Sequence, residues 1–387
     1  MYVVEGGRVP IKIWSDEPVE GGALEQARHL ADLPFAYQWI ALMPDTHQGY
    51  GMPIGGVLAA DGFVVPNAVG LDIGCGVRAW RTNLTAEEFL PLRQRVLNDI
   101  QRNVPTGREW HRQPQTHAVL QHMPNVPALH EQRDRAAMQL GSLGGGNHFY
   151  EVQRDDDGRV WVMVHSGSRN VGKLMAEHYD RFARAYNDRQ PAERHVPPQW
   201  DLAPLPVDSG EGREYLTVMN WCLDFAYANR ELMAECAHNA LHRVFPNYEP
   251  EPFVDVHHNY ARLETHFGRE VMVHRKGAVR AVGAVIVPGS MGSASYIGEG
   301  LANPEAFASC AHGAGRAISR AEAKRRIPVQ TVIEQLRAKN IALLKVKKSD
   351  VAEEAPGAYK DIDAVMAGQR DLVRITVALT PLGVVKG

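Results

Sequence analysis

The chain has 387 residues, of which 44% are hydrophobic and 22% charged, and its formal net charge is −3. This length and composition allow a substantial buried core, and the negative charge excludes attraction of the whole molecule to a polyanion, so any nucleic-acid contact needs a local basic patch. Four scattered cysteines cannot form a disulfide framework, and neither an 18-residue apolar run nor a leader peptide is present, so we expect a soluble, cytoplasmic protein.

The expected elements do not alternate regularly along the chain. Apolar spacing predicts helices at residues 21–33, 85–103, 208–243 and 358–371, and strands at 39–43, 77–83, 160–164, 270–274, 282–287 and 373–377. This order favours an α+β fold with mixed or antiparallel sheets over a doubly wound one. We find no linker or repeat, so we expect one domain over residues 1–387, with the helix at about 208–243 embedded in it.

Glycine-rich segments lie beside the polar clusters of the chain. Residues 49–56, 141–146 and 288–292 are of this kind. Glycine permits positive φ and close approach of the backbone to a ligand, so we expect an active site on Gly-rich loops at strand ends. Neither a Walker A motif nor a GxGxxG loop followed by a helix is present, which excludes the two common phosphate-binding loops.

Residues 72–76 (DIGCG) point to metal chemistry. Asp72 and Cys75 stand three residues apart in a glycine-punctuated turn, where a carboxylate and a thiol can converge on one cation. A lone buried cysteine or histidine is more often structural. Here histidines beside glycine or small polar residues recur at 148, 165, 257–258 and 312, and together they offer a mixed nitrogen, oxygen and sulfur ligand set.

Ten short motifs occur in an order that resembles the RtcB family of RNA ligases. They are 43–47 (MPDTH), 69–76 (VGLDIGCG), 146–149 (GNHF), 165–169 (HSGSR), 257–259 (HHN), 275–278 (RKGA), 288–292 (PGSMG), 312–316 (HGAGR), 359–363 (YKDID) and 385–387 (VKG). The resemblance runs from end to end. It implies a GTP- and Mn²⁺-dependent enzyme that joins an RNA 3′-phosphate or 2′,3′-cyclic phosphate to a 5′-hydroxyl through a guanylylated histidine, in tRNA splicing or RNA repair.

The resemblance also implies a set of metal ligands. These are Asp72, Cys75, His148, His165 and His258, which would hold two Mn²⁺ ions. A thiolate has lone pairs enough to bridge two ions, while affinity alone would favour zinc or copper, so the ligands do not by themselves select manganese. For His257 we expect packing or support of its neighbour His258.

A nucleophile and a nucleotide site follow from the same resemblance. His312 matches the guanylylated histidine, and Asp45 matches the residue that orients it. Glu151 could pair with guanine N1–H and N2–H₂, Tyr359 could stack or donate a hydrogen bond, and Lys386 could reach the base or ribose. The full set of expected GTP contacts is Asn147, Glu151, Pro288, Gly289, Ser290, Ser295, His312, Gly313, Ala314, Gly315, Tyr359 and Lys386.

The RNA end is expected to meet arginines. Arg169 and Arg316 can grip a phosphate bidentately, with Asn147 as a further contact and Lys276 as a weaker candidate. Three features depart from the family pattern. Asn170 stands where we expect glycine, and Gly145 stands where the family pattern usually shows a small hydroxyl or another residue. Residues 108–140 form a shorter and different segment, so the choice of RNA substrate is the part of the resemblance that transfers least.

Two other functions remain open from the sequence. A binuclear metal phosphoesterase that opens cyclic phosphates without ligation would keep Asp72, Cys75 and the clustered histidines but would not need His312, Glu151 or Lys386. An RNA-binding repair partner would keep its RNA affinity after chelation of metal. RNA ligation, with RNA and GTP as partners and an activating protein as a further possible one, is the function that the ten motifs favour.

Overall fold

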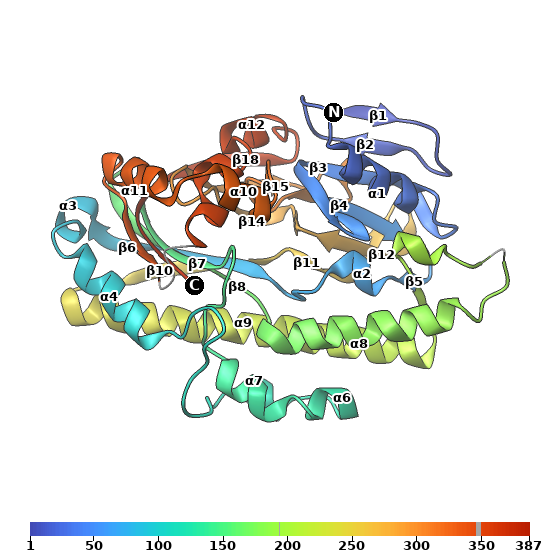
Figure 1. Cartoon of the computed structure of the whole chain (residues 1–387), viewed down its shortest axis with the longest axis horizontal. Coiled ribbons are helices and arrows are strands. Elements are labelled where there is room, and N and C mark those ends of the chain that lie inside the picture. The colour runs from blue at the N-terminus through green and yellow to red at the C-terminus, as the bar shows by residue number, and fades with distance from the viewer. Residues whose placement is uncertain (193, 346–349) are drawn as a thin grey trace.

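Two large β-sheets stand side by side in the computed structural model, which describes residues 1–192, 194–345 and 350–387 (Figure 1). The first has the order β1-β2-β3-β4-β12-β11, with β2 and β3 parallel and the other pairs antiparallel. Its strands are β1 (Tyr2–Val4), β2 (Ile11–Ile13), β3 (Ala36–Tyr50), β4 (Met52–Ala60), β11 (Asn259–His266) and β12 (Arg269–Lys276).

The second sheet has the order β10-β6-β8-β7-β18-β15-β14, and β17 joins it by a parallel pairing with β18. Its strands are β6 (Gly76–Thr85), β7 (Phe149–Arg154), β8 (Arg159–Ser166), β10 (Pro250–His257), β14 (Val282–Val287), β15 (Ser295–Leu301), β17 (Ala342–Lys345) and β18 (Val373–Lys386). Two small pairs complete the strands: β5 (Phe63–Val64) with β9 (Leu205–Pro206), and β13 (Ala278–Arg280) with β16 (Ser309–Ala311).

One residue, His258, joins the two sheets. It lies between β10 of the second sheet and β11 of the first. The segment from α2 (Pro66–Val69) to β6 makes a second crossing and carries Asp72 and Cys75. Candidate ligands therefore lie on connections at the junction of the sheets.

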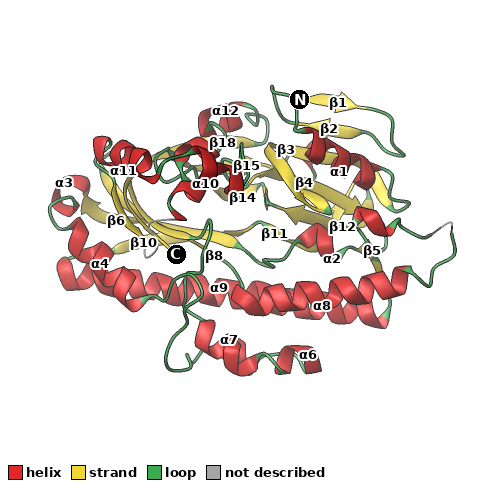
Figure 2. Cartoon of the chain, viewed as in Figure 1, coloured by secondary structure: helices red, strands yellow, loops and turns green. Residues whose placement is uncertain are grey.

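Helices surround the strands, which occupy the middle of the molecule (Figure 2). The longest, α9 (Gly210–Val244), starts at Ser209, whose side chain accepts a hydrogen bond from the Gly212 N–H, and it runs beside α8 (Arg169–Asn187) beneath both sheets (Figure 1). The other helices are α1 (Gly21–Ala31), α3 (Ala86–Phe89), α4 (Arg93–Asn103), α5 (Ala118–Gln121), α6 (Pro127–His130), α7 (Arg133–Gln139), α10 (Arg320–Arg326), α11 (Val329–Ala338) and α12 (Ile362–Ala367). Among the described residues, none of these helices is long and apolar enough to cross a bilayer.

The expected α+β class with mixed and antiparallel sheets is confirmed, and so is the strand at Val282–Val287. The single helix expected at 85–103 is wrong: Pro91 cannot continue a helix, and the chain forms α3, which begins with a capping box of Thr85 and Glu88, and then α4. Helix α8 was not expected at all. Its buried residues Val171, Met175, Tyr179 and Ala183 recur every four residues, directly after a segment that glycine and serine mark as a loop.

Candidate active site at the junction of the two sheets

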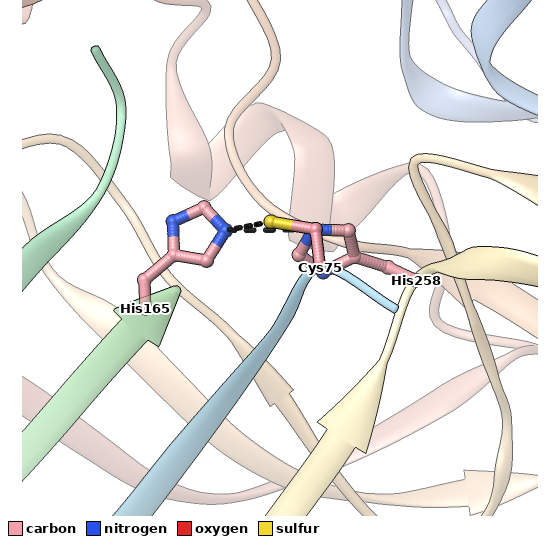
Figure 3. A group of neighbouring side chains, drawn as sticks. All are labelled: Cys75, His165 and His258. Atoms are coloured by element: carbon pink, nitrogen blue, oxygen red, sulfur yellow. Dashed lines mark hydrogen bonds between the residues drawn. The ribbon is translucent and has the colours of Figure 1, made fainter. Parts of the chain in front are cut away.

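Five side chains converge at the junction, and their polar atoms face one another. Cys75 Sγ lies 3.3 Å from Nε2 of His148 and 3.3 Å from Nε2 of His165. Asp72 Oδ2 is 3.1 Å from Nε2 of His148, and Nε2 of His258 is 3.4 Å from that of His165. Figure 3 shows Nε2 of His165 pointing at the Cys75 sulfur with His258 beside it. All five residues predicted as metal ligands are therefore brought together.

The cluster divides into two triads that share one sulfur atom. Cys75, His165 and His258 form one group that could hold a metal ion, and Asp72, Cys75 and His148 form the other. Backbone carbonyls fix two of the rings, because Nδ1 of His148 lies 2.9 Å from Leu143 O and Nδ1 of His165 lies 3.2 Å from Asn147 O. Each Nδ1 is then the donor, and each Nε2 keeps its lone pair for the centre of the cluster.

Burial disfavours the positively charged form of two clustered imidazoles, those of His165 and His258. It lowers the pKa of His165 and of His258 well below the ordinary value, in both cases with the help of neighbouring histidines. Burial also raises the pKa of the Cys75 thiol, with the Asp72 charge acting in the same direction. Asp72 Oδ1 and His258 Nδ1 are buried polar atoms without a hydrogen-bond partner among the described residues. Buried polar atoms without partners are costly, and a cation could supply the missing interactions. This group of side chains is therefore suited to a cation that replaces the proton of the Cys75 thiol.

Two buried polar residues of α9 hold the loops that carry the ligands. Arg230 is fully buried, forms an ion pair with Asp255, and donates to the carbonyls of Gly74 at 3.2 Å and Ser166 at 3.1 Å. Asn229, also fully buried, donates through Nδ2 to Ser142 O at 3.1 Å and to Gly167 O at 3.2 Å. The embedded helix thus fixes the segments next to Cys75, His165 and His148.

His312 lies beside the cluster and is held by a buried carboxylate. Its Nδ1 is 2.6 Å from Asp45 Oδ2, and its backbone N–H donates to the same oxygen at 3.1 Å. The ring centroid is 4.8 Å from that of His258. Asp45 lies inside β3, where the register with β4 shifts between Leu42 and His47, so a strand irregularity and not a glycine loop presents it. The arrangement leaves Nε2 of His312 as the nitrogen with a free lone pair.

A cavity opens on one side of His312 and collects the predicted GTP contacts. Its lining includes Asn147, Glu151, Pro288, Gly289, Ser290, His312, Gly313, Ala314, Gly315, Tyr359 and Lys386. Ser295 lies outside the lining and supports it, because its Oγ accepts hydrogen bonds from Gly289 N at 3.1 Å and Gln153 Nε2 at 2.9 Å. The lining residues that were not among the expected GTP contacts are His47, Ile54, Phe149, His165, Met291, Arg316 and Arg320, of which His165 was expected as a metal ligand and Arg316 as an RNA-phosphate contact.

Glu151 is a buried carboxylate in the wall of this cavity. Its Oε1 accepts a hydrogen bond from Gln153 Nε2 at 2.5 Å. Burial raises its pKa from 4.5 to about 8, although the Gln153 hydrogen bond and the Lys386 charge pull the other way. An edge of a base that carried two N–H groups would supply the donors that the ionised carboxylate lacks.

The three predicted phosphate-binding cations have different surroundings. Arg169 donates to Ser142 Oγ at 3.0 Å and Gly107 O at 3.3 Å, and the charges of Asp72 and Cys75 act on it against the effect of burial, which lowers its pKa overall. Arg316 lines the cavity beside His312, and its guanidinium donates to Ile318 O at 3.0 Å and Glu353 O at 2.8 Å. The structure does not show these two arginines in one site.

Lys276 lines a second pocket, which reaches His312 from the other side. This pocket also includes Asp72, Cys75, Asn147 and His258, and it shares Ile54, Asn147 and His312 with the first cavity. Lys276 Nζ donates to the carbonyls of Tyr50 and Asn67, and burial lowers the pKa of Lys276 to about 7. Two pockets therefore meet at the His312 ring.

The three departures from the family pattern have local explanations. The left-handed residue is Arg169 itself, with φ 58, so Asn170 needs no special conformation. A Cβ on Gly145 would come no closer than 3.5 Å to any neighbour, whereas one on Gly144 would lie 2.1 Å from Arg169 Nη1. Residues 108–140 form a loop and the helices α5, α6 and α7, and His111 Nε2 lies 3.1 Å from Gly141 O, a contact that joins this segment to the glycine loop.

His257 does not face the ligand cluster. Its Nδ1 lies 3.0 Å from Gly74 O and 3.3 Å from Nη2 of Arg230, and burial together with the Arg230 charge lowers its pKa to about 4. Residues that sequence reasoning missed are Gln153, Asn229, Arg230 and Glu354, all fully buried or nearly so. Asn229 and Arg230 belong to the polar run 229–231 of a helix, which in the sequence looks like an exposed face, so no signal distinguished them.

Two triads that could hold metal ions, a histidine held by a carboxylate and an adjoining cavity are the features expected of a metal-dependent enzyme. Comparison with known proteins gives the class directly. The family model described as tRNA-splicing ligase RtcB matches residues 26–387. The chain is 38% identical to the RNA-splicing ligase RtcB of Escherichia coli strain K12, over 98% of this chain and 97% of that protein. It is 35% identical to the tRNA-splicing ligase RtcB of Thermococcus kodakarensis, over 98% and 95%. The chain belongs to the RtcB family of RNA ligases.

Proposed function

We propose that this protein seals RNA in a GTP- and Mn²⁺-dependent reaction, joining a 3′-phosphate or 2′,3′-cyclic phosphate end to a 5′-hydroxyl through guanylylated His312. The observation that carries the proposal is the position of His312. It is fixed by Asp45 and lines both a cavity that holds the expected GTP contacts and a pocket that contains Asp72, Cys75 and His258. A phosphoesterase that only opened cyclic phosphates would need neither the cavity nor this histidine.

Asp72, Cys75, His148, His165 and His258 would hold the metal ions, and the shared Cys75 sulfur suits a pair. The unpartnered Asp72 Oδ1 and His258 Nδ1, together with three imidazole nitrogens aimed inward, fit such an occupant. The choice of Mn²⁺ rests on the family resemblance. When bound, the ions would stabilise negative charge that develops on the phosphate oxygens.

His312 performs the first chemical step. Its Nε2 attacks the α-phosphorus of GTP, an N–P bond forms, the P–O bond to pyrophosphate breaks, and pyrophosphate leaves. The proton on Nδ1 stays on the ring, where the Asp45 carboxylate compensates the positive charge of the guanylylated imidazole. Asp45 also fixes the ring through the backbone N–H, so the nucleophilic nitrogen has one orientation.

Two transfers complete the reaction, after any cyclic phosphate has been hydrolysed to a 3′-phosphate. An oxygen of the RNA 3′-phosphate attacks the GMP phosphorus, the N–P bond breaks, and His312 regains its lone pair. The 5′-hydroxyl then attacks the RNA 3′-phosphorus, a phosphodiester forms, GMP leaves, and the hydroxyl proton is released to solvent. Entry of RNA through the pocket that holds Lys276 and Asp72 would let the nucleotide stay in its own cavity.

Transfer of label from GTP to the protein tests the proposal. Incubation with α-labelled GTP and Mn²⁺ should give a labelled band on a denaturing gel, and the label should move to an RNA with a 3′-phosphate when that RNA is added. Joining to a 5′-hydroxyl RNA should follow. A protein that opens 2′,3′-cyclic phosphates but never takes label would instead be a phosphoesterase.

A further inference from the structure

One carboxylate, Glu354, contacts four side chains that line the nucleotide cavity. It lies at the end of a 3-10 turn (Ala352–Glu354), and its side chain has no exposed surface. Lys386 Nζ donates to Oε2 at 3.1 Å, and the Tyr359 hydroxyl donates to the same oxygen. On Oε1, Arg316 Nη1 lies at 3.4 Å and Arg320 Nε at 3.6 Å.

These four partners come from separate parts of the chain. Lys386 ends β18, Tyr359 follows a 3-10 turn (Pro356–Ala358), Arg316 lies in the loop after β16, and Arg320 opens α10. Three of them carry positive charge. Without a buried anion they would repel one another and turn toward solvent, so Glu354 sets both the charge balance and the side-chain directions in this wall of the cavity.

The ion pairs are strong enough to act in this way. Burial would raise the pKa of Glu354, but the Lys386 charge, the Tyr359 hydrogen bond and the two arginines lower it to about 2. The carboxylate is therefore ionised at every pH at which the protein would work. The Tyr359 hydroxyl proton is engaged by Glu354, so toward a ligand Tyr359 can present its ring face or an oxygen lone pair.

We propose that Glu354 is a positioning residue for the guanine nucleotide, acting chiefly through Lys386 and Tyr359 and without touching the nucleotide itself. This inference rests on the proposed function and adds a residue to it. Removal of the charge should release Lys386 from its fixed direction, raise the KM for GTP in self-guanylylation, and change kcat less.

The test uses four variants of the full chain: Glu354→Gln, Lys386→Met, the double variant, and Glu353→Gln as a matched control. The Glu353 side chain forms an ion pair with Lys324, away from the cavity. Arg316 contacts the backbone carbonyl of Glu353, and replacement by glutamine keeps that contact. We expect the KM for GTP to rise at least about tenfold in Glu354→Gln and to stay within about twofold in Glu353→Gln.

The double variant separates positioning from general structural damage. If Glu354 acts through Lys386, the double variant should bind GTP no more than about threefold worse than Lys386→Met, because the second change has little left to remove. Losses that multiply, or an unchanged KM in Glu354→Gln, would overturn the assignment. Thermal unfolding of each variant shows whether it folds. If Glu354→Gln does not fold, the double variant replaces it in the comparison, because it removes both charges of the ion pair.

Equilibrium binding of GTP tests the positioning role of Glu354 independently of the ligase mechanism. Calorimetry on the same variants measures nucleotide affinity whether or not His312 takes label. Loss of affinity in Glu354→Gln, in a protein that never becomes labelled, would support the positioning role and refute the ligase mechanism. Unchanged affinity in a protein that does become labelled would refute the positioning role and support the ligase mechanism.

Discussion

Oδ2 of Asp45 accepts two hydrogen bonds from His312, one from ring Nδ1 at 2.6 Å and one from the backbone N–H at 3.1 Å. A single carboxylate oxygen therefore sets both the tautomer of the ring and the path of the loop that carries it. Asn at position 45 could present an amide N–H to Nδ1 and reverse the tautomer.

We therefore expect His312→Asn to abolish self-guanylylation and Asp45→Asn to slow it by at least about a hundredfold, with little change in metal content. Labelling with α-labelled GTP at several times measures both rates. His178→Asn, on α8, is a suitable control and should label normally. Normal labelling of His312→Asn would place the nucleophile elsewhere.

Cys75→Ser should lose bound metal, because a serine hydroxyl stays protonated at neutral pH and cannot bridge two ions as a thiolate does. Elemental analysis of protein dialysed against Mn²⁺ should show the loss, and ligation should fall with it. Cys222→Ser is the matched control, since Cys222 is also buried but belongs to neither ligand triad. That control should retain its metal and lose only stability. Full metal content in Cys75→Ser would remove the thiolate from the site.

GTP affinity should increase as the pH rises toward 8. Because burial raises the pKa of Glu151 to about 8, the free protein carries a proton there below that pH, and the guanine edge requires the ionised form. Binding should therefore release about one proton at pH 7. Calorimetry in buffers of different ionisation enthalpy measures that proton. The release should vanish in Glu151→Gln, and its persistence would assign the proton to another group.

The same carboxylate should affect folding with a definite sign. Between pH 4.5 and about 8 the folded state binds the Glu151 proton and the unfolded state does not, so this group's contribution to stability falls as the pH rises through that window. Glu151→Gln should flatten the dependence. Urea titrations at pH 5.5 and 8 measure the free energy of unfolding of the parent protein and of Glu151→Gln. The same change with pH in both proteins would contradict the raised pKa of Glu151.

Arg169 and Arg316 should respond differently to replacement by lysine. Arg169→Lys should leave self-guanylylation nearly intact and slow sealing of a 3′-phosphate RNA, since misplacement of the attacking oxygen by about an ångström costs roughly a hundredfold. Arg316 donates to Ile318, Glu353 and Glu354 within the nucleotide cavity, so Arg316→Lys should impair both steps. Single-turnover assays of the two steps measure this, and equal effects of the two changes would refute the distinction.

From the sequence we could predict which side chains gather beside Cys75 and most of those that line the cavity at His312, for a reason that particular residues illustrate. Asp72 and Cys75 lie in one short turn, and the glycine loops around 146, 289 and 313 mark backbone that must approach a ligand closely. Strands such as Val282–Val287 have β-branched residues and clear boundaries. The resemblance to the RtcB family supplied the order in which these pieces belong together.

Contacts between distant segments could not be predicted in the same way. Glu354 and Arg230 look like ordinary charged residues in the sequence, and only burial against Lys386 or Gly74 distinguishes them. The strand expected at 39–43 stops before Asp45, yet β3 continues through Asp45 to Tyr50 because pairing with β4 absorbs the irregular register. Helix α8 was missed because its first residue, Arg169, has positive φ directly after a glycine-containing loop.

The hydrogen bond from His312 to Asp45 joins residues 267 positions apart. All five candidate metal ligands lie between residues 72 and 258, so a chain emerging during synthesis would contain them well before the residue that is proposed to take GMP. Contacts of such separation form late in folding because long loops must close first. Capture of metal could thus precede the ability to consume GTP, and labelling by GTP would report that both ends of the chain have reached their final places.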